Sequence, residues 1–398
     1  MATRAGVGLS GDADSSRAAR EASTRALMQA GVNRADWGIV FATGPHRPRY
    51  AAVLTAVQEC LRTEFLTGCS AWGVIASGEE VEGQPAVAVL AVQSDRIEAE
   101  TLLAPAGEDA GPHAASEIAV LAGKRSQGVA GEDLLVLLPD PFAFRPELLL
   151  KELGRTMPGT PAIGGAAAGT PRADQTFQFY GRNVATRSVA GLYLSGGLQT
   201  GIGITQGCQP LGAPCRVTAG GGNLILELDG RPALEVLRSR LPGPLRDELQ
   251  RLGGHLFVAL PPEADQERID PGEYLVRSLV GADPERGSLA ISATIEVGQL
   301  LLLVLREGQA ARDDLKQMLA RVAAAPGRPD YRFGLYFNCA ARGASLYGIP
   351  GIDSAYISGA LPNLPILGLF GNAEIAPLRG SNRFFTHTGV LALVAEVP

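Results

Sequence analysis

Polar residues able to bind a charged small molecule gather near the C-terminal end of the sequence. Two apolar runs, Phe333–Cys339 and Pro365–Phe370, are typical of buried strands, and both end in small and polar residues. If the two strands are neighbours in a sheet, their C-terminal ends surround one crevice, a common place for ligands in sheets with parallel pairs. The candidate ligand-binding residues at these ends are Asn338, Cys339, Arg342, Gly343, Asn372 and Glu374.

Arg342 and Glu374 give this predicted crevice its chemistry. Arginine holds a carboxylate through paired hydrogen bonds and glutamate accepts from an ammonium group, so the two together suit an amino acid. The alternative is that they pair with each other, or cap turns, in a purely architectural network. The turn formed by Gly68, Cys69 and Ser70 ends another short strand and is a candidate second wall of the site.

Cys69 and Cys339 each lie at a predicted strand end beside small or polar residues. A nucleophilic thiol needs a lowered pKa and usually a nearby base, and no histidine lies close to either cysteine in the sequence. Because cysteine is more often a small buried apolar residue, we expect no catalytic residue and no enzymatic activity. A thiol-dependent enzyme using Cys69 or Cys339 is the alternative.

The histidines lack the spacing of metal ligands. None has a partner four residues away or a CxxCH neighbour, so we expect no metal site and no cofactor. One axial histidine suffices for haem, which leaves haem as an alternative with His387 or His46 as the ligand. The glycine turns at Gly68, Gly164 and Gly368 offer backbone N–H groups to an anion. Tight strand–helix packing is the simpler interpretation, since these three turns carry neither a GxGxxG nor a GxxxxGK[ST] motif.

Composition excludes several classes of protein. The 398 residues are 46% hydrophobic and 19% charged, with mean hydropathy +0.10, which is typical of a well-packed globular chain. A net charge of −6 argues against a nucleic-acid partner. The N-terminus lacks the apolar segment of a signal peptide and no apolar run is long enough to span a bilayer, so we expect no membrane association. Five scattered cysteines form no disulfide framework, which favours the cytoplasm.

One supersecondary pattern recurs three times along the chain: helix, strand, helix, glycine turn, strand. The strand–helix–strand part predicts a right-handed crossover between parallel strands, and the short polar turns that follow predict antiparallel pairing. The segments are 15–31, 37–42, 50–65, 66–73 and 86–92 in the first copy, 113–125, 134–138, 146–153, 160–169 and 189–195 in the second, and 311–324, 333–337, a short helix, 367–374 and 389–395 in the third.

A β-rich insert separates the second copy from the third. A hairpin around Ala219–Asn223 and a helix ending near Arg240 are followed by four predicted strands. We therefore predict an α+β fold: two mixed, largely antiparallel sheets flanked by helices in a four-layer-like arrangement, with internal pseudo-repeats. Two consecutive domains are expected, residues 1–210 and 211–398.

These motifs together resemble the FIST family (F-box and intracellular signal transduction proteins). FNCAARG, LGLFGNAEIAP and NRFFTHT resemble its C-terminal domain, and VGLS, IVFAT, GCS and IGG resemble its N-terminal domain. The connecting stretches GCQPLGAPCRVT and LELDGRPAL are also similar, so the resemblance covers essentially the whole chain. The sequence departs from the family at Ala341, Ala373 and Ala376, where the family usually has glycine, which implies an altered or narrower pocket.

The resemblance implies a sensory module that binds a small ligand, with amino acids among the proposed ligands. This chain carries no F-box, kinase or cyclase segment, so we expect a cytoplasmic sensor that binds a small polar, amino acid-like metabolite and signals through a separate protein partner. Because some members resemble haem-binding nitric-oxide sensors, a haem-binding gas sensor is the alternative that the family implies.

Overall fold

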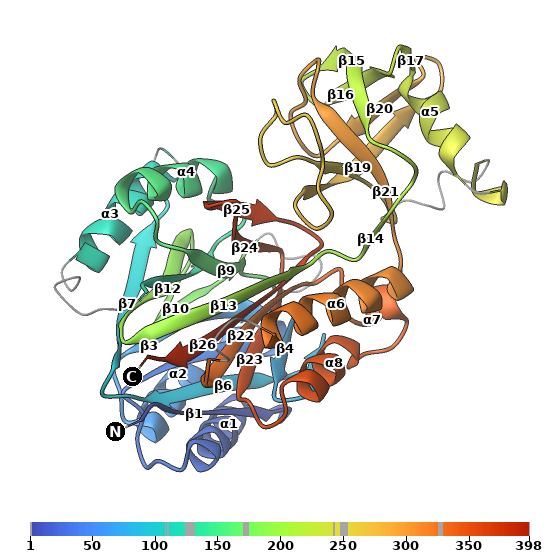
Figure 1. Ribbon diagram of the computed structural model, residues 1–398. Helices are drawn as coiled ribbons and strands as arrows, with labels where there is room; N and C mark the ends of the chain where they lie inside the picture. The colour runs from blue at the N-terminus through green and yellow to red at the C-terminus, as the bar shows by residue number, and fades with distance from the viewer. Residues whose placement is uncertain are drawn as a thin grey trace. The chain divides into compact units, whose positions relative to one another are not determined.

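The computed structural model describes residues 2–107, 109, 111–123, 132–169, 175–241, 243–246, 254–324 and 329–397 (Figure 1). The chain forms two compact units, and Thr205–Leu315 make the smaller one. Residues up to 204 and from 316 onward make the larger unit, so the chain leaves it near the expected boundary at 210 but returns to it at 316. The units are therefore not two consecutive halves, because the third repeat joins the first two after the insert.

The larger unit contains three six-stranded sheets, one for each repeat of the sequence. The first has the order β1 (Arg4–Ser10), β6 (Val87–Gln93), β2 (Trp37–Thr43), β3 (Leu66–Ala71), β10 (Gln178–Tyr180) and β11 (Asn183–Ala185). The second has the order β7 (Ile97–Pro105), β12 (Ser188–Gly196), β8 (Leu134–Pro139), β9 (Ala162–Ala166), β24 (Ala373–Leu378) and β25 (Ser381–Phe385). The third has the order β13 (Leu198–Thr205), β26 (Gly389–Glu396), β22 (Tyr331–Cys339), β23 (Ile366–Gly371), β4 (Gly73–Ala76) and β5 (Glu79–Glu82).

Each sheet is built around one parallel pair of strands, as the crossover pattern predicts. The pairs are β2 with β3, β8 with β9, and β22 with β23. A parallel pair needs a long connection, and helices supply it in all three repeats. The crossover helices are the 3-10 helix η1 (Gly44–Arg49) with α2 (Tyr50–Leu61), then α4 (Pro146–Thr156), then α7 (Ala344–Tyr347) with α8 (Ile352–Ala360). The helices that precede the pairs are α1 (Ser15–Ala30), α3 (Pro112–Gly123) and α6 (Gly308–Ala323). The expected helix over 113–125 is thus found as α3, and its last two residues lie outside the described part of the chain.

One glycine in each parallel pair explains why the glycine turns repeat. Gly68, Gly164 and Gly368 each sit opposite the first strand of their pair. A Cβ at these positions would lie 1.8, 1.9 and 2.5 Å from the carbonyl oxygens of Val40, Leu137 and Tyr336, respectively. Such distances are far inside van der Waals contact, so the close approach of the strands requires glycine. The three glycines therefore serve structural packing, although between neighbouring strands and not between a strand and a helix as expected.

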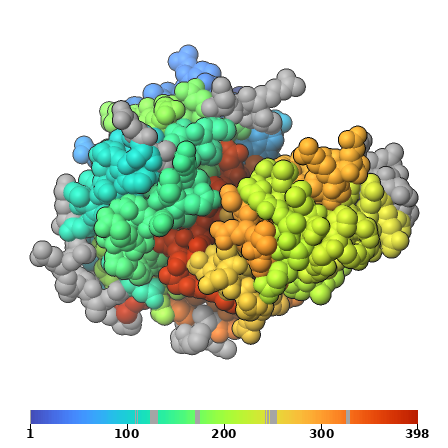
Figure 2. All heavy atoms as spheres, turned by 90° about the horizontal axis from the view of Figure 1, so that it is seen from above, coloured from blue at the N-terminus to red at the C-terminus, as the bar shows by residue number. Residues whose placement is uncertain are grey.

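The short hairpin of each repeat joins the sheet of another repeat. The β4–β5 hairpin of the first repeat extends the third sheet, β10–β11 of the second extends the first, and β24–β25 of the third extends the second. Three equivalent backbone hydrogen bonds of 3.0 Å accompany this cyclic exchange: Trp72 N–H donates to Phe370, Ala168 N–H to Ser70, and Asn372 N–H to Ala166. Helix α4 also packs against β25, seen in Figure 2 as teal atoms beside red ones. The three repeats are therefore interlocked rather than simply adjacent.

The smaller unit is a closed β-barrel. Strand β21 (Leu300–Arg306) pairs with both β15 (Cys215–Gly221) and β18 (Leu256–Leu260), which closes a ring through β16 (Leu224–Leu228), β20 (Ser288–Ile291) and β19 (Leu275–Asp283). The accessory elements are β14 (Cys208–Pro210), β17 (Arg231–Pro232), α5 (Ala233–Arg240) and the 3-10 helix η2 (Gly243–Arg246). A core of aliphatic side chains fills the unit, with Ile225, Leu228, Val258, Leu289 and Leu301 all less than 2% exposed. The hairpin, the helix and the four strands expected in the insert are all present.

The α+β class, the mixed and largely antiparallel sheets with flanking helices and the internal repeats are confirmed. The number of sheets differs, since the described residues form four where the sequence suggested two. Three of the four lie in the larger unit because each repeat builds its own sheet, and the fourth is the barrel of the smaller unit. Within the described residues, no helix has both the length and the apolar composition needed to cross a bilayer.

Candidate functional site

The three repeats place three strand ends at equivalent positions. Thr43, Asp140 and Cys339 are each three residues beyond the partner of the packing glycine. The backbone N–H of each residue donates across 3.0 Å to a carbonyl oxygen at the start of the last strand of its repeat. The acceptors are Ala86, Ser188 and Thr388, respectively. Ends of parallel strands are where ligands of such sheets usually bind. The three positions are therefore comparable candidate sites with different side chains.

In the third repeat, the strand end is closed by a buried ion pair. The Arg342 Nε lies 3.0 Å from Asp353 Oδ2, and Arg342 Nη2 donates across 3.2 Å to Asp353 Oδ1. Both side chains are fully buried. The arginine therefore pairs with an aspartate of α8 and not with Glu374, and its buried guanidinium is not open to a ligand carboxylate.

Three further side chains complete this network around Asp353. Tyr336 Oη and Asn338 Nδ2 donate to Asp353 Oδ2 across 2.8 and 3.0 Å, and Tyr347 Oη donates to Oδ1 across 2.6 Å. Tyr347 Oη in turn accepts a 2.7 Å hydrogen bond from Arg342 Nη2. The carboxylate thus accepts five hydrogen bonds. The candidate residue Asn338 belongs to the same network and has a structural partner.

The charges of the pair stabilise each other despite their burial. Burial by itself raises the pKa of Asp353, but the Arg342 guanidinium and the hydrogen-bond donors outweigh it and hold the pKa below its usual value. Burial likewise opposes the charge of Arg342, and the Asp353 carboxylate more than offsets this, so the pKa of Arg342 is raised. The pair is ionised, and separating its members would leave a buried charge without compensation.

Asn372, Glu374 and Cys339 lie near this strand end but are engaged by the chain itself. Asn372 Nδ2 donates across 2.8 Å to the carbonyl oxygen of Ala167 in the second repeat. Glu374 is fully buried and its Oε2 accepts a 3.1 Å hydrogen bond from Thr388 N–H. The Cys339 N–H donates to the carbonyl oxygen of the same Thr388. These candidates are brought together, although as a junction between repeats and not around an open crevice.

Gly343 approaches a carboxylate from the first repeat. It has a φ of 65°, and a Cβ here would lie 2.5 Å from Glu82 Oε1. Glu82 Oε1 accepts a 3.0 Å hydrogen bond from the N–H of Ala344 at the start of α7. Glu80 of the same hairpin accepts from Gly351 N–H and Ser354 N–H at the start of α8, across 2.6 and 2.8 Å. The exchanged hairpin therefore caps both crossover helices, which sequence reasoning missed.

The proposed second wall is also structural. Cys69 is fully buried, and burial raises the pKa of its thiol, which keeps the thiol protonated and poorly nucleophilic. Ser70 Oγ accepts a 3.1 Å hydrogen bond from Phe177 N–H, and Ser70 N–H donates across 2.9 Å to the Phe177 carbonyl oxygen. Together with Gly68, which packs on Val40, these residues tie the first sheet to the second repeat. Ala373 and Ala376 are buried in β24.

In the first repeat the strand end is filled by a buried histidine. His46 lies six residues beyond Val40, the position that Arg342 has in the third repeat, and is 1% exposed. Its Nδ1 lies 2.9 Å from Ser15 Oγ at the start of α1. Burial lowers the pKa of His46, although the carboxylates of Asp12 and Asp14 oppose this change. A neutral imidazole thus fills this position.

The strand end of the second repeat opens into a cavity. The cavity has a volume of about 290 Å³ and is lined by Asp140, Phe142, Ala143, Gln175, Thr186 and Arg187. Asp140 is 3% exposed and forms its floor, whereas Arg187 and Phe142 are exposed at its edge. Sequence reasoning missed these residues. Aligning the strand ends of the three repeats would have pointed to Asp140.

Hydrogen bonds to the backbone fix the Asp140 carboxylate in this cavity. Its Oδ1 accepts from the N–H groups of Phe142 and Ala143 across 2.8 and 3.2 Å, and its Oδ2 accepts from Arg187 N–H across 3.1 Å. An ionised carboxylate has about four acceptor positions, so Oδ2 retains room for one more donor. The cavity is thus lined by a carboxylate that the backbone holds in place and by an arginine, Arg187, the combination expected of a site for a zwitterion.

Two observations on the described residues bear on a metal ion or haem. No group of three or more potential ligand side chains is found among them. An apolar cavity of about 500 Å³ lies between α6 and α8, but no histidine lines it; its lining consists of Lys316, Leu319, Ala320, Ala323, Ala355, Tyr356, Gly359 and Ala360. His387 lies in the turn before β26 with a φ of 61°, and His113 is half-exposed beside Glu117. The haem alternative therefore gains no support from these residues.

Comparisons with known proteins agree with the sequence motifs. Residues 36–231 match the FIST N domain and residues 233–377 match the FIST C domain. An uncharacterized protein of Mycobacterium tuberculosis is 33% identical over 395 residues, covering 99% of this chain and all of that protein. One from Mycobacterium bovis is 32% identical over 397 residues, covering 99% of each chain. An F-box/LRR-repeat protein of Arabidopsis thaliana is 31% identical over 104 residues, 25% of this chain and 20% of that protein. The chain belongs to the FIST family, whose domains are generally signal-sensing domains.

Proposed function

We propose that the protein senses a small zwitterionic metabolite, such as an amino acid, in the cavity at the strand end of the second repeat. The observation that carries this proposal is that an acidic residue, Asp140, and a basic residue, Arg187, both line one cavity of about 290 Å³. This volume is close to the lower end of the range for small-ligand pockets. It therefore suits a single amino acid better than a larger cofactor.

Each part of an amino acid has a counterpart in this cavity. The ammonium group donates to Asp140 Oδ2, and the carboxylate accepts from the Arg187 guanidinium. Phe142, which is 57% exposed, offers an apolar surface to the side chain of the ligand. Because Asp140 is already held by three backbone N–H groups, it binds the ammonium without reorganising, which lowers the cost of binding.

The same three contacts suggest how binding becomes a signal. Arg187 N–H and Phe142 N–H both donate to Asp140, so a ligand on this carboxylate acts on two loops at once, the one after β8 and the one before β12. A ligand shifts a conformational equilibrium only if it binds one state better than the other. We propose that a separate protein partner reads this change, that the protein acts in the cytoplasm, and that it works without catalysis or a bound cofactor.

Calorimetric titration with phenylalanine tests the site. N-acetylphenylalanine lacks the ammonium group, and phenylalanine methyl ester lacks the carboxylate. Each should bind at least about tenfold more weakly than phenylalanine, because each loses a hydrogen bond between charged groups. In the Arg187→Ala variant the difference between phenylalanine and its methyl ester should disappear. Arg155→Ala, which removes an exposed arginine paired with Glu152 on α4, is the matched control and should bind like the wild type.

Two results would overturn the proposal. One is equal binding of phenylalanine and both derivatives, which would show that neither charge of the ligand is recognised. The other is unchanged binding by Arg187→Ala, which would place the ligand elsewhere. If no amino acid from a complete set produces heat or raises the melting temperature, the assignment of this ligand class is wrong, since a ligand specific to the native state must stabilise it.

A further inference from the structure

A second polar cavity lies on the larger unit, and it shares no lining residue with the Asp140 cavity. Its volume is about 750 Å³. Three segments form its walls: the end of α2 with the residues that follow it, strand β7, and the turn of the β10–β11 hairpin. The lining residues are Gln58, Arg62, Thr63, Glu64, Phe65, Glu100, Thr101, Tyr180, Gly181 and Arg182.

Hydrogen bonds join two of the three walls of this cavity, the hairpin turn and the segment from the end of α2 to β3. Gln58 is 8% exposed, and its Oε1 accepts a 2.8 Å hydrogen bond from Arg182 Nε on the exchanged hairpin. The Gly181 N–H donates across 2.8 Å to the carbonyl oxygen of Leu66, the first residue of β3. The hairpin comes from the second repeat and α2 from the first, so the cavity is built by the exchange between repeats. The hydrogen bond from Nε to Gln58 holds the Arg182 guanidinium at the cavity, and a guanidinium has further N–H groups that can donate to a ligand.

The charged lining is balanced and includes two aromatic rings. Arg62 and Arg182 contribute two positive charges, and Glu64 and Glu100 contribute two negative charges. A ligand with several phosphate groups would face both carboxylates, which opposes its binding. Phe65 is 40% exposed and Tyr180 is partly exposed, so both rings offer apolar surface inside a polar rim. The lining therefore favours a ligand that carries charges of both signs together with an apolar group.

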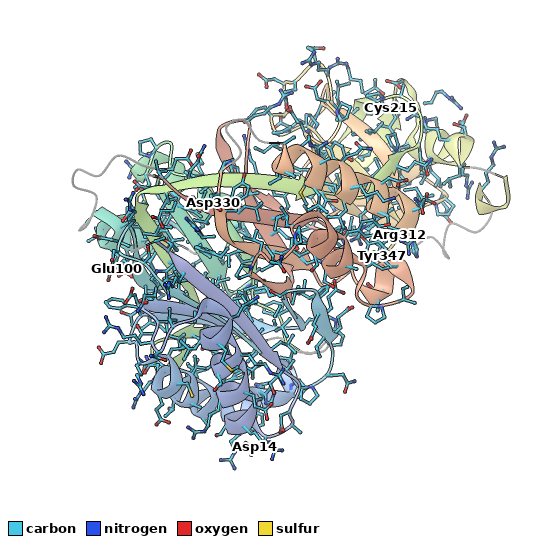
Figure 3. All side chains as sticks on the ribbon, turned by 60° about the horizontal axis from the view of Figure 1, so that its bottom comes forward. Asp14, Glu100, Cys215, Arg312, Asp330 and Tyr347 are labelled. Atoms are coloured by element: carbon cyan, nitrogen blue, oxygen red, sulfur yellow. The ribbon has the colours of Figure 1, made fainter. Side chains whose placement is uncertain are left out.

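We propose that this cavity binds a short peptide with free termini. A volume of about 750 Å³ exceeds what one amino acid fills, whereas a peptide of a few residues separates its two terminal charges by several ångströms. Its carboxylate binds the arginines Arg62 and Arg182, its ammonium group binds the glutamates, and a central apolar side chain packs on Phe65. Figure 3 places Glu100 at the side of the unit away from Tyr347, so this site is separate from the buried network around Asp353.

Titration of the full chain with the tripeptide alanyl-phenylalanyl-alanine tests this proposal. The free tripeptide should bind. Its N-acetylated and C-amidated form should have an affinity at least about tenfold lower, because both charge-assisted contacts are lost. Arg182→Ala and Arg62→Ala should each weaken binding of the free tripeptide to a similar degree. Both side chains are exposed, so the melting temperature of the variants serves as a check that the fold is intact. Arg155→Ala is again the matched control.

The outcomes separate this site from the Asp140 cavity. Arg187→Ala should leave tripeptide binding unchanged, and Arg182→Ala should leave phenylalanine binding unchanged. Equal binding of the blocked and free tripeptides would overturn the proposal, as would wild-type affinity in the Arg62→Ala/Arg182→Ala double variant. Competition by adenosine monophosphate at lower concentration than the tripeptide would show that the site prefers a phosphate ligand, and absence of tripeptide binding at millimolar concentration would remove the site.

Discussion

The side chains of Arg342 and Asp353 form a fully buried ion pair, with Arg342 Nε 3.0 Å from Asp353 Oδ2. The aspartate is the second residue of α8, and the arginine lies just after the C-terminal end of β22. The ion pair therefore holds this crossover helix against the end of the strand. In the first repeat the equivalent position holds His46, which contacts Ser15, and in the second it holds Ala143 beside a cavity. The strand end that opens into a cavity thus carries the smallest of the three side chains at this position.

Removing one member of this pair should be strongly destabilising. We expect Arg342→Ala to lower the free energy of unfolding of the larger unit by about 3–5 kcal/mol, because it leaves the Asp353 carboxylate buried without its counter-charge. The double variant Arg342→Ala/Asp353→Ala should lose less than the sum of the two single variants, since neither charge remains. Both tryptophans, Trp37 and Trp72, lie in the larger unit, so urea unfolding followed by their fluorescence reports on this unit. A loss below about 1 kcal/mol, as typical of exposed ion pairs, would contradict the buried pairing.

The pair also predicts a pH dependence with a definite sign. The pKa of Asp353 is below its unfolded value of 3.8 in the folded protein. Its contribution to stability is therefore fully present above that value and is lost as the pH falls through the folded pKa. Asp353→Asn should be less stable than the wild type at neutral pH, and its stability should fall less steeply on acidification below about pH 5. Asp265→Asn, at an exposed aspartate, is the control and should follow the wild-type curve. Parallel acid-unfolding curves for wild type and Asp353→Asn would show that Asp353 does not titrate in this way.

Much of the fold could be predicted because its signals are local. Strands such as Leu134–Pro139 are uninterrupted apolar runs, and the glycine of each parallel pair stands at the same place in its repeat. The exchange of hairpins could not be predicted in the same way. Strands β4 and β23 pair although Gly73 and Phe370 are far apart in the sequence, and a four-residue strand carries no signal for its partner. Local pattern thus specified the repeats, while their interlocking is a tertiary property.

The candidate site shows the same limit. Strand-end placement correctly brought Asn338, Cys339, Asn372 and Glu374 near one another. It expected Arg342 and Glu374 to bind a ligand in an open crevice, or else to pair with each other, whereas Arg342 pairs with Asp353. One signal for the true partner was present: Asp353 and Ile357 are one turn apart on α8 and both are buried. An acidic residue on the buried face of a short helix needs a buried partner. Distinguishing a closed strand end from an open one required the side-chain contacts themselves.

The packing glycines predict a sharp contrast between two glycine-to-alanine substitutions. Gly164→Ala places a methyl group 1.9 Å from the Leu137 carbonyl oxygen in the middle of a sheet, so we expect a loss of about 3 kcal/mol or more in unfolding free energy, as for other disrupted cores. Gly154→Ala is the matched control on α4, where nothing lies within 4 Å of the added Cβ. It should be neutral or stabilising by up to about 1 kcal/mol, the difference in helix propensity. Similar stabilities of the two variants would contradict the close approach of β8 and β9.

The cysteines allow a direct test of the thiol-enzyme alternative. Cys69 is fully buried and burial raises the pKa of its thiol, so iodoacetamide should leave it unmodified in the native protein near neutral pH. Cys60 and Cys208 are partly exposed and should be modified first, which mass spectrometry of the digested protein can show residue by residue. Cys339, the other candidate thiol, is also buried in the larger unit and should react together with Cys69 after addition of urea. Rapid modification of Cys69 before any other cysteine would instead identify an activated thiol and favour a catalytic role, because neither exposure nor ordinary thiol acidity would account for such a rate.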